Sequence, residues 1–173
     1  MSVPIKFGAG AMFPIFSWPK VGGGAVTPGA GVDWRMLVIY RGAHCALCVR
    51  YLHRVSGLQK QFTSAGVRVW ALSADPLDRA AEQATREGWC IPVLAELQQD
   101  QMRELGLYIS APRSPGETDR NFAEPAIFVI NPESKVQIVD VSNAPFARPE
   151  PQGLLEALSF VIDTRYPIRG TAG

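Results

Sequence analysis

Two of the chain's three cysteines lie three residues apart in the segment YRGAHCALCVRYL, residues 40–52. A cysteine thiolate can attack a disulfide or a peroxide, and it can also bind a metal ion. The pair Cys45 and Cys48 is therefore a redox site, half of a metal site, or two small core residues. In a chain without a framework of many cysteines, a Cys-x-x-Cys pair favours redox chemistry.

A zinc site is the main metal-binding alternative for this pair. Structural zinc needs four ligands, and only His44, His53 and Cys90 remain as further nitrogen or sulfur donors. His53 points away from the cysteines on the expected helix and fits a surface residue. We therefore expect no metal ion and no other cofactor.

The helix expected after residue 45 distinguishes the two cysteines. Cys48 is in line with the apolar residues Leu52 and Val55, so it faces the core and should be buried. Cys45 lies at the helix cap, where free N–H groups lower a thiol pKa, and it should be partly exposed. This geometry predicts that Cys45 attacks and that Cys48 resolves the resulting mixed disulfide.

Three further residues are candidates for supporting roles. His44 could stabilise the thiolate or transfer a proton, or it could be a solvated loop residue. Arg41 could stabilise a thiolate or a leaving oxygen, although an exposed charge at a strand end is the more common situation. Cys90 is a possible additional resolving cysteine, but we expect it more often as a small buried hydrophobic residue.

Hydrophobic periodicity places this segment between two strands. An apolar run at 35–40 predicts a buried strand, residues 45–65 predict a helix that ends at Gly66, and VRVWALS at 67–73 predicts a second strand. A right-handed crossover between the two strands makes them a parallel pair.

The rest of the chain predicts further helices and an antiparallel hairpin. A helix follows Asp75 as N-cap and ends at Gly88, and a short strand and a short helix come next. Residues 108–124 form a long polar loop, which in a compact domain is usually functional or mobile. The runs AIFVI and VQIVDV then pair across NPESK, and the last helix covers 151–163.

The predicted architecture is an α/β thioredoxin-like fold, with a central mixed sheet and helices on both faces. The Gly- and Pro-rich residues 1–34 add an irregular leader with a short N-terminal hairpin. A length of 173 residues suits one domain, residues 1–173.

Composition restricts the partners of the protein. A net charge of +1 gives no electrostatic basis for binding nucleic acid, and the longest apolar runs are far too short to span a bilayer. The Pro- and Gly-interrupted start MSVPIKFGAG offers no secretory signal. We therefore expect a soluble, cytoplasmic protein with neither a nucleic-acid nor a membrane partner.

Several segments together resemble a known family. VIYRGAHCALCVRYL, VWALSAD, IPVLAEL, EPAIFVINPESKVQIVDVSNAPF and YPIRG are similar to the peroxiredoxin-like branch of the alkyl hydroperoxide reductase/thiol-specific antioxidant (redoxin) family. The resemblance covers nearly the whole chain. It implies a thioredoxin fold and thiol-based redox chemistry, with a peroxide as oxidant.

The chain departs from the peroxiredoxin signature Pro-x-x-x-Thr-x-x-Cys. The signature cysteine falls on Cys48, its threonine on Cys45 and its proline on Arg41, while a later family arginine falls on Pro125. A Cys-x-x-Cys pair together with a proline before the hairpin strand resembles thioredoxin instead. That resemblance predicts a cis peptide before Pro125, in a loop that faces the cysteines; the alternative is a trans proline that starts a strand.

These features lead to one main hypothesis and one alternative. The main hypothesis is a thiol-dependent oxidoreductase that cycles through a Cys45–Cys48 disulfide, reduces a peroxide or a disulfide, and is reduced by a thioredoxin- or glutathione-type partner. The family resemblance favours the peroxide, whereas the missing threonine and arginine favour the disulfide. The alternative is a non-catalytic redox-sensing or binding module. A homodimer is a candidate assembly.

Overall fold

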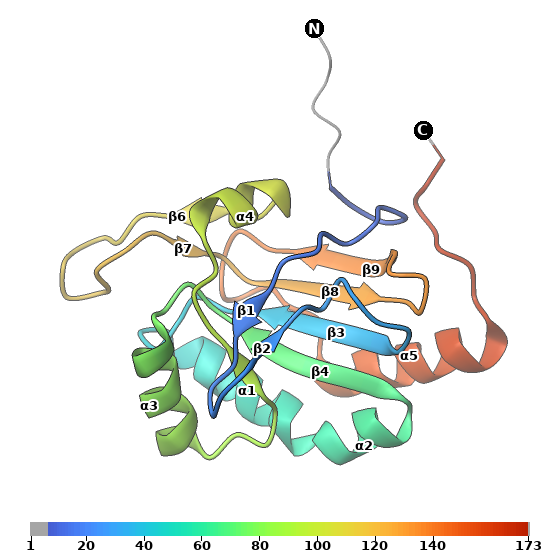
Figure 1. Ribbon diagram of the computed structural model, residues 1–173, viewed down its shortest axis with the longest axis horizontal. Helices are drawn as coiled ribbons and strands as arrows, with labels where there is room; N and C mark the ends of the chain where they lie inside the picture. The colour runs from blue at the N-terminus through green and yellow to red at the C-terminus, as the bar shows by residue number, and fades with distance from the viewer. Residues whose placement is uncertain (1–6, 173) are drawn as a thin grey trace, which may run out of the picture.

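A five-stranded mixed sheet forms the centre of the protein (Figure 1). The computed structural model describes residues 7–172. In spatial order, the strands are β5 (Val93–Leu94), β4 (Val67–Leu72), β3 (Trp34–Ile39), β8 (Ala126–Ile130) and β9 (Val136–Val141).

The first crossover is parallel, as the sequence predicts. β3 and β4 pair in parallel from Trp34 with Val67 to Ile39 with Leu72. β5 continues the parallel part, whereas β8 pairs antiparallel with β3 and with β9. The carboxyl ends of β3 and β4 therefore meet at one edge of the sheet, and the segments that follow these strands are neighbours in space.

Helices cover both faces of the sheet because the side chains of β3 alternate between two cores. Met36 and Val38 point to one core, and Leu37 and Ile39 point to the other. Helices α1 (Ala46–Gly57), α2 (Gln59–Ser64) and α5 (Pro151–Thr164) pack on the first core. Helix α4 (Gln99–Glu104) and the N-terminal leader pack on the second core.

The N-terminal hairpin is confirmed, and the long polar loop has a hairpin base. β1 (Trp18–Pro19) and β2 (Ala25–Val26) pair across the glycine-rich turn. β6 (Ile109–Ser110) and β7 (Phe122–Ala123) pair antiparallel, so that residues 111–121 project as a closed loop.

The helix expected over 45–65 is interrupted. Leu58 leaves the helical conformation, with φ −98° and ψ 3°, so α1 ends at Gly57 and α2 starts at Gln59. Glycine has a low helix propensity, and the Leu58 amide bonds the Val55 carbonyl in a tightened last turn. Gly66 follows α2 with φ +79°.

The predicted N-cap of the next helix is wrong by one residue. Helix α3 (Leu77–Glu87) has Pro76 at its N-cap position, and Gly88 ends it in the left-handed conformation. Asp75 does not cap this helix, because its carboxylate is bonded to the backbone of another segment, as described below.

Candidate active site

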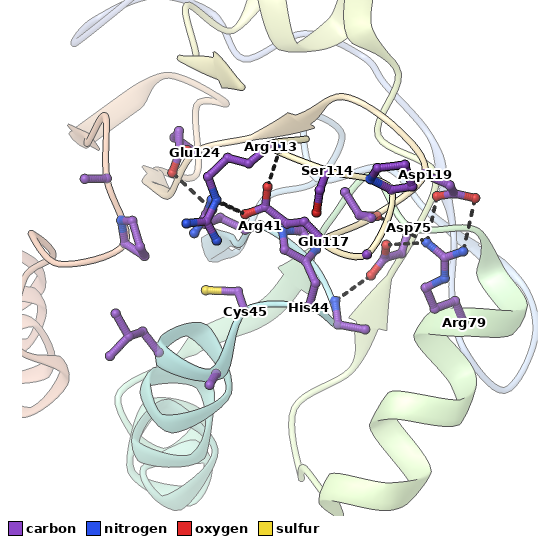
Figure 2. Close-up of a pocket in the computed structure, with 18 of the residues that line it drawn as sticks. Arg41, His44, Cys45, Asp75, Arg79, Arg113, Ser114, Glu117, Asp119 and Glu124 are labelled. Atoms are coloured by element: carbon purple, nitrogen blue, oxygen red, sulfur yellow. Dashed lines mark hydrogen bonds and ion pairs between the residues drawn. The ribbon is translucent and has the colours of Figure 1, made fainter. Parts of the chain in front are cut away.

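Cys45 is the N-cap residue of α1, and its sulfur accepts a hydrogen bond from the amide of Cys48 at 3.2 Å. The sulfur therefore lies at the positive end of the helix, where a negative charge is stabilised. Cys45 is 4% exposed, which is less than the sequence suggested, yet its side chain lines an open pocket of about 1210 Å³. Figure 2 shows Cys45 at the start of the helix, in this pocket.

The pKa values of the two thiols are shifted in opposite directions. A hydrogen bond from the Cys48 side chain is the largest effect that lowers the pKa of Cys45, to about 6; the Cys48 amide and the charges of Arg41 and Arg148 add to it. The pKa of Cys48 is raised, because its proton is held by Cys45 and because the residue is fully buried. Cys45 is therefore the thiolate at neutral pH, and Cys48 keeps its proton.

Asp75 holds the turn that presents Cys45. Its carboxylate accepts a hydrogen bond from the Ala43 amide at 2.7 Å, and the Cys45 amide bonds the Gly42 carbonyl at 3.2 Å. Gly42 has φ +133°, and a Cβ atom there would lie 2.8 Å from the carboxylate. Only glycine fits this close approach. Asp75 follows β4 and Cys45 follows β3, so the parallel pairing brings them together.

We expect Asp75→Ala to destabilise the protein by about 1–3 kcal/mol, because the partly buried Ala43 amide loses its partner and a buried carboxylate is removed from the turn. The presentation of Cys45 should be disturbed as well, which would slow its alkylation at pH 7. Urea denaturation and iodoacetamide kinetics measure the two effects. The matched control is Asp100→Ala, since this aspartate is 93% exposed and lies outside the site. Equal losses in both variants would contradict the role of Asp75.

His44 lies in the pocket but is neither solvated nor charged. Its ring packs against Phe122 with centroids 4.6 Å apart, and neither ring nitrogen has a hydrogen-bond partner among residues 7–172. Burial, followed by the nearby Arg41 charge, lowers the pKa of His44. A neutral imidazole can accept a proton but cannot stabilise a thiolate as a cation.

Arg41 faces two carboxylates in the pocket. Its guanidinium lies 3.4 Å from Glu117 and 3.4 Å from Glu124, and it stacks over Phe122 at 4.7 Å. The side chain is 17% exposed, so Arg41 is not a free surface charge. Figure 2 shows Arg41 close to Cys45, with both acids beside it.

Two sequence predictions about the site are wrong. The described residues contain no cis peptide bond, so Pro125 is trans; it directly precedes β8, and its carbonyl accepts the Ser142 amide. This is the intrinsic preference of an X–Pro bond, and the site imposes no other isomer. Cys90 is exposed instead of buried, because β5 begins only at Val93.

The structure does not bring Cys90 to the cysteine pair. The Cys90 amide donates a hydrogen bond to the Ser56 hydroxyl near the end of α1, whereas Cys45 is the N-cap of the same helix. The two residues therefore lie near opposite ends of α1. All three cysteines are free thiols.

His53 is surface-exposed, as expected, and lies 3.0 Å from Glu87. Within residues 7–172, no group of three His, Cys, Asp or Glu side chains could hold a metal ion.

Arg148 is a second cation near the thiols, and the sequence analysis did not identify it. Its guanidinium lies 4.4 Å above the Tyr51 ring and donates a hydrogen bond to the Pro145 carbonyl at 2.9 Å. Its Nη1 atom is buried without a hydrogen-bond partner in the described part of the chain. Arg148 lowers the pKa of both cysteines. About 100 residues separate it from Cys45, so no local pattern could reveal it.

We expect Arg148→Gln to shift the pH profile of Cys45 alkylation to higher pH, because a stabilising positive charge is lost. The rate at pH 6 should fall about two- to threefold, while the plateau at high pH should stay unchanged. The control is Arg169→Gln, an arginine that also lies over a tyrosine ring, Tyr166, but whose charge is not among those that shift the pKa of either cysteine. An unshifted profile in Arg148→Gln would refute the effect.

Comparisons with known proteins agree with this fold. A profile described as the AhpC/TSA family matches residues 9–139. A cysteine-to-serine mutant of peroxiredoxin 6 from Arenicola marina has a TM-score of 0.75 at 19% identity, covering 91% of this chain and 74% of that chain. Peroxidoxin BcpB from Mycobacterium tuberculosis has a TM-score of 0.73 at 19% identity, covering 90% and 98%.

AhpC from Enterococcus faecalis is similar to the same extent, with a TM-score of 0.73 at 16% identity and coverage of 92% and 97%. None of the curated proteins matches the chain significantly. At these identities the solved structures support the thioredoxin-like fold alone, and the family profile carries the assignment.

The family profile, together with the fold, defines a thiol-dependent oxidoreductase of the thioredoxin-like superfamily. The chain belongs to the AhpC/TSA family, and it is an oxidoreductase of the peroxiredoxin type. No helix within residues 7–172 is both long and apolar enough to cross a membrane.

Proposed function

We propose that the protein reduces peroxides through a cycle in which Cys45 attacks and Cys48 resolves. The observation that carries this proposal is the position of Cys45 at the N-cap of α1, where its sulfur accepts the Cys48 amide and its pKa is lowered to about 6. A thiolate at neutral pH is the form that reacts with peroxides and disulfides.

The cycle has three steps. The Cys45 thiolate attacks the outer oxygen of the hydroperoxide, the O–O bond breaks, and Cys45 becomes a sulfenic acid while the alkoxide leaves and is protonated to an alcohol. The Cys48 thiol then attacks the Cys45 sulfur, forming the Cys45–Cys48 disulfide and releasing water. A dithiol reductant of the thioredoxin type reduces this disulfide and is itself oxidised to a disulfide.

Local groups support the first step without the family threonine. Amides of the first turn of α1 and the cations Arg41 and Arg148 provide positive potential where charge develops on the leaving oxygen. The neutral imidazole of His44 is a proton acceptor in the same pocket. Glutathione is the second candidate reductant. The redox-sensing alternative has no support from the family match.

The cellular setting is part of the same proposal. A Cys45–Cys48 pair must be reduced again between turnovers, so we place the protein in the reducing cytoplasm. We also propose a homodimer, because β9 is the last strand of the sheet and the N-terminal leader bonds only its first residue, Val136, within the described residues, so that the rest of this strand edge is open to pairing with another chain. Light scattering on a gel-filtration peak measures the mass of the assembly.

The test of the function is stopped-flow oxidation of the reduced protein by hydrogen peroxide and, separately, by 2-hydroxyethyl disulfide. We expect the peroxide to react faster at pH 7 and the product to contain a Cys45–Cys48 linkage by mass spectrometry, since residues three apart at a helix start can bring their sulfurs within bonding range. A faster reaction with the disulfide would assign the protein to thiol–disulfide exchange. A dominant bond to Cys90 would reject the cycle itself.

A further inference from the structure

Opposite charges line the pocket around Cys45. The guanidinium groups in its wall belong to Arg41, Arg79 and Arg113. The carboxylates in its wall belong to Asp75, Glu117, Asp119 and Glu124, and thus outnumber the guanidinium groups by one. His44 adds no charge, because its pKa is lowered. An oxidant that approaches Cys45 therefore meets a surface without excess positive charge.

Every one of these guanidinium groups already has a carboxylate partner. Arg79 lies 2.9 Å from Asp119 and 3.5 Å from Asp75. Arg113 lies 3.1 Å from Glu117. Figure 2 shows these pairs along the rim of the pocket. A carboxylate on a substrate would therefore compete with the protein's own carboxylates for these guanidinium groups.

Arg41 is the lining cation whose charge lowers the pKa of Cys45, and it is the most enclosed of the three. Glu117 and Glu124 each lie 3.4 Å from its guanidinium. Without these acids, Arg41 would offer an anionic substrate a bidentate partner next to the reacting sulfur. With them, an anionic substrate has to compete for the donors of Arg41 with two acids that are already in place, although the charge of Arg41 still lowers the pKa of Cys45.

Glu117 is held in place independently of Arg41. One of its oxygens accepts the Arg113 amide at 2.7 Å, and the other accepts the Arg113 side chain at 3.1 Å. Its side chain is only 8% exposed, although it belongs to the projecting loop 111–121. These bonds lower the pKa of Glu117, so the carboxylate is ionised at neutral pH. The loop 111–121 therefore holds a negative charge in a fixed position beside Arg41.

We propose that Glu117 is a specificity-determining residue that excludes anionic oxidants from the Cys45 pocket by occupying Arg41. The substrates are then uncharged or cationic hydroperoxides or disulfides, and those bearing carboxylates are disfavoured. The substrate class rests on the proposed function, whereas the charge selection at Cys45 can be measured without turnover.

The test compares alkylation of Cys45 by iodoacetate, an anion, and by iodoacetamide, its uncharged analogue of similar size. The ratio of the two rate constants cancels any change in the thiolate population, because both reagents need the thiolate. We expect Glu117→Gln to raise the iodoacetate-to-iodoacetamide ratio about three- to tenfold at low ionic strength, with the gain reduced at high salt. Peptide mapping assigns the signal to Cys45.

Matched variants separate this effect from general charge and from misfolding. Glu133→Gln removes an exposed carboxylate outside the pocket, and Glu117→Asp keeps the charge, so both should keep the wild-type ratio. Glu124→Gln removes the other acid beside Arg41; it should also raise the ratio, and it gives an independent measurement if Glu117→Gln does not fold. On an Arg41→Gln background, the gain from Glu117→Gln should disappear.

The proposal would be overturned if the iodoacetate-to-iodoacetamide ratio stayed unchanged in both Glu117→Gln and Glu124→Gln. It would also be overturned if Glu133→Gln raised the ratio equally. A gain that persists without Arg41 would overturn the assignment to Arg41.

Substrate preference is tested with three disulfides of similar size: cystamine, 2-hydroxyethyl disulfide and 3,3′-dithiodipropionate. The quantity compared is the rate constant for oxidation of Glu117→Gln divided by that of the wild type. This quotient should exceed one for the anionic 3,3′-dithiodipropionate, stay near one for the neutral 2-hydroxyethyl disulfide and fall below one for the cationic cystamine. Equal relative rates for all three would refute the specificity. If no peroxide or disulfide oxidises Cys45, the proposed function fails, and the alkylation ratio still decides the role of Glu117.

Discussion

Cys45→Ser is expected to lower the rate of thiol alkylation at the site at pH 7 by roughly 100-fold or more. At this pH a thiol with a pKa of about 6 is mostly ionised, whereas a thiol with an ordinary pKa is only a few per cent ionised and a thiol with a raised pKa far less. The remaining thiol, Cys48, is fully buried as well. Reaction with hydrogen peroxide should be lost to the same degree. Iodoacetamide kinetics and stopped-flow peroxide oxidation measure the two rates.

The control for this experiment is Cys90→Ser. Cys90 is exposed and would add a background alkylation. Cys45→Ser and Cys48→Ser are therefore each made in the Cys90→Ser chain and compared with that chain. If Cys45→Ser keeps its reactivity toward peroxide and Cys48→Ser loses it, the attacking cysteine is Cys48, on which the signature cysteine of the peroxiredoxins falls. Cys45 would then be the resolving residue or a replacement for the family threonine.

Cys48→Ser is expected to keep the first oxidation of Cys45 but to block the cycle. Without a neighbouring thiol, the oxidised Cys45 remains a sulfenic acid or a mixed disulfide. Turnover with a dithiol reductant should fall about 100-fold or more, because an intramolecular attack at high effective concentration is replaced by an intermolecular one. Intact mass measurements after one equivalent of oxidant reveal the trapped species.

Serine and alanine at this position distinguish resolution from activation. The Cys48 side chain donates the hydrogen bond that lowers the pKa of Cys45 most, and a serine hydroxyl can still donate. Cys48→Ser should therefore leave the pH profile of Cys45 alkylation close to wild type, whereas Cys48→Ala should shift it to higher pH. Full turnover in Cys48→Ser would show that the disulfide is not an intermediate.

The site combines a family scaffold with a local replacement of the family chemistry. The position of the signature threonine is taken by Cys45 and that of the signature proline by Arg41. In the structure, the Cys48 amide, Arg41 and Arg148 provide donors and positive charge around the Cys45 sulfur. Two of these groups are local to the Cys-x-x-Cys segment, and one comes from the segment before α5.

Much of the fold was predictable because it depends on local periodicity. The apolar runs and glycine stops of residues 35–73 predicted the parallel pair β3 and β4 with a helical crossover, and the structure confirms it. The β8–β9 hairpin and the N-terminal hairpin are also confirmed. The same helical stripe placed Cys48 in the core, and Cys48 is fully buried.

The errors have two sources: long-range contacts override a local preference at Asp75 and Cys45, and the structure does not follow a family analogy at Pro125. Asp75 is expected to cap α3, but it lies one residue before the N-cap, and its carboxylate accepts a hydrogen bond from the Ala43 amide of another segment. Pro125 was given a cis peptide by analogy with thioredoxin, and the structure has only trans bonds in its described residues. Cys45 was expected to be partly exposed and is 4% exposed, since segments distant in sequence enclose the pocket.

The sequence by itself determined the two thiols, their three-residue spacing at a helix start and the α/β scaffold, since these depend on neighbouring residues and on hydrophobic period. Only the tertiary structure decided the electrostatics around Cys45. Arg148, Glu117 and Asp75 reach the site from three separate segments, and a charge acts through distance in space and through burial. Neither quantity can be read from the order of residues along the chain.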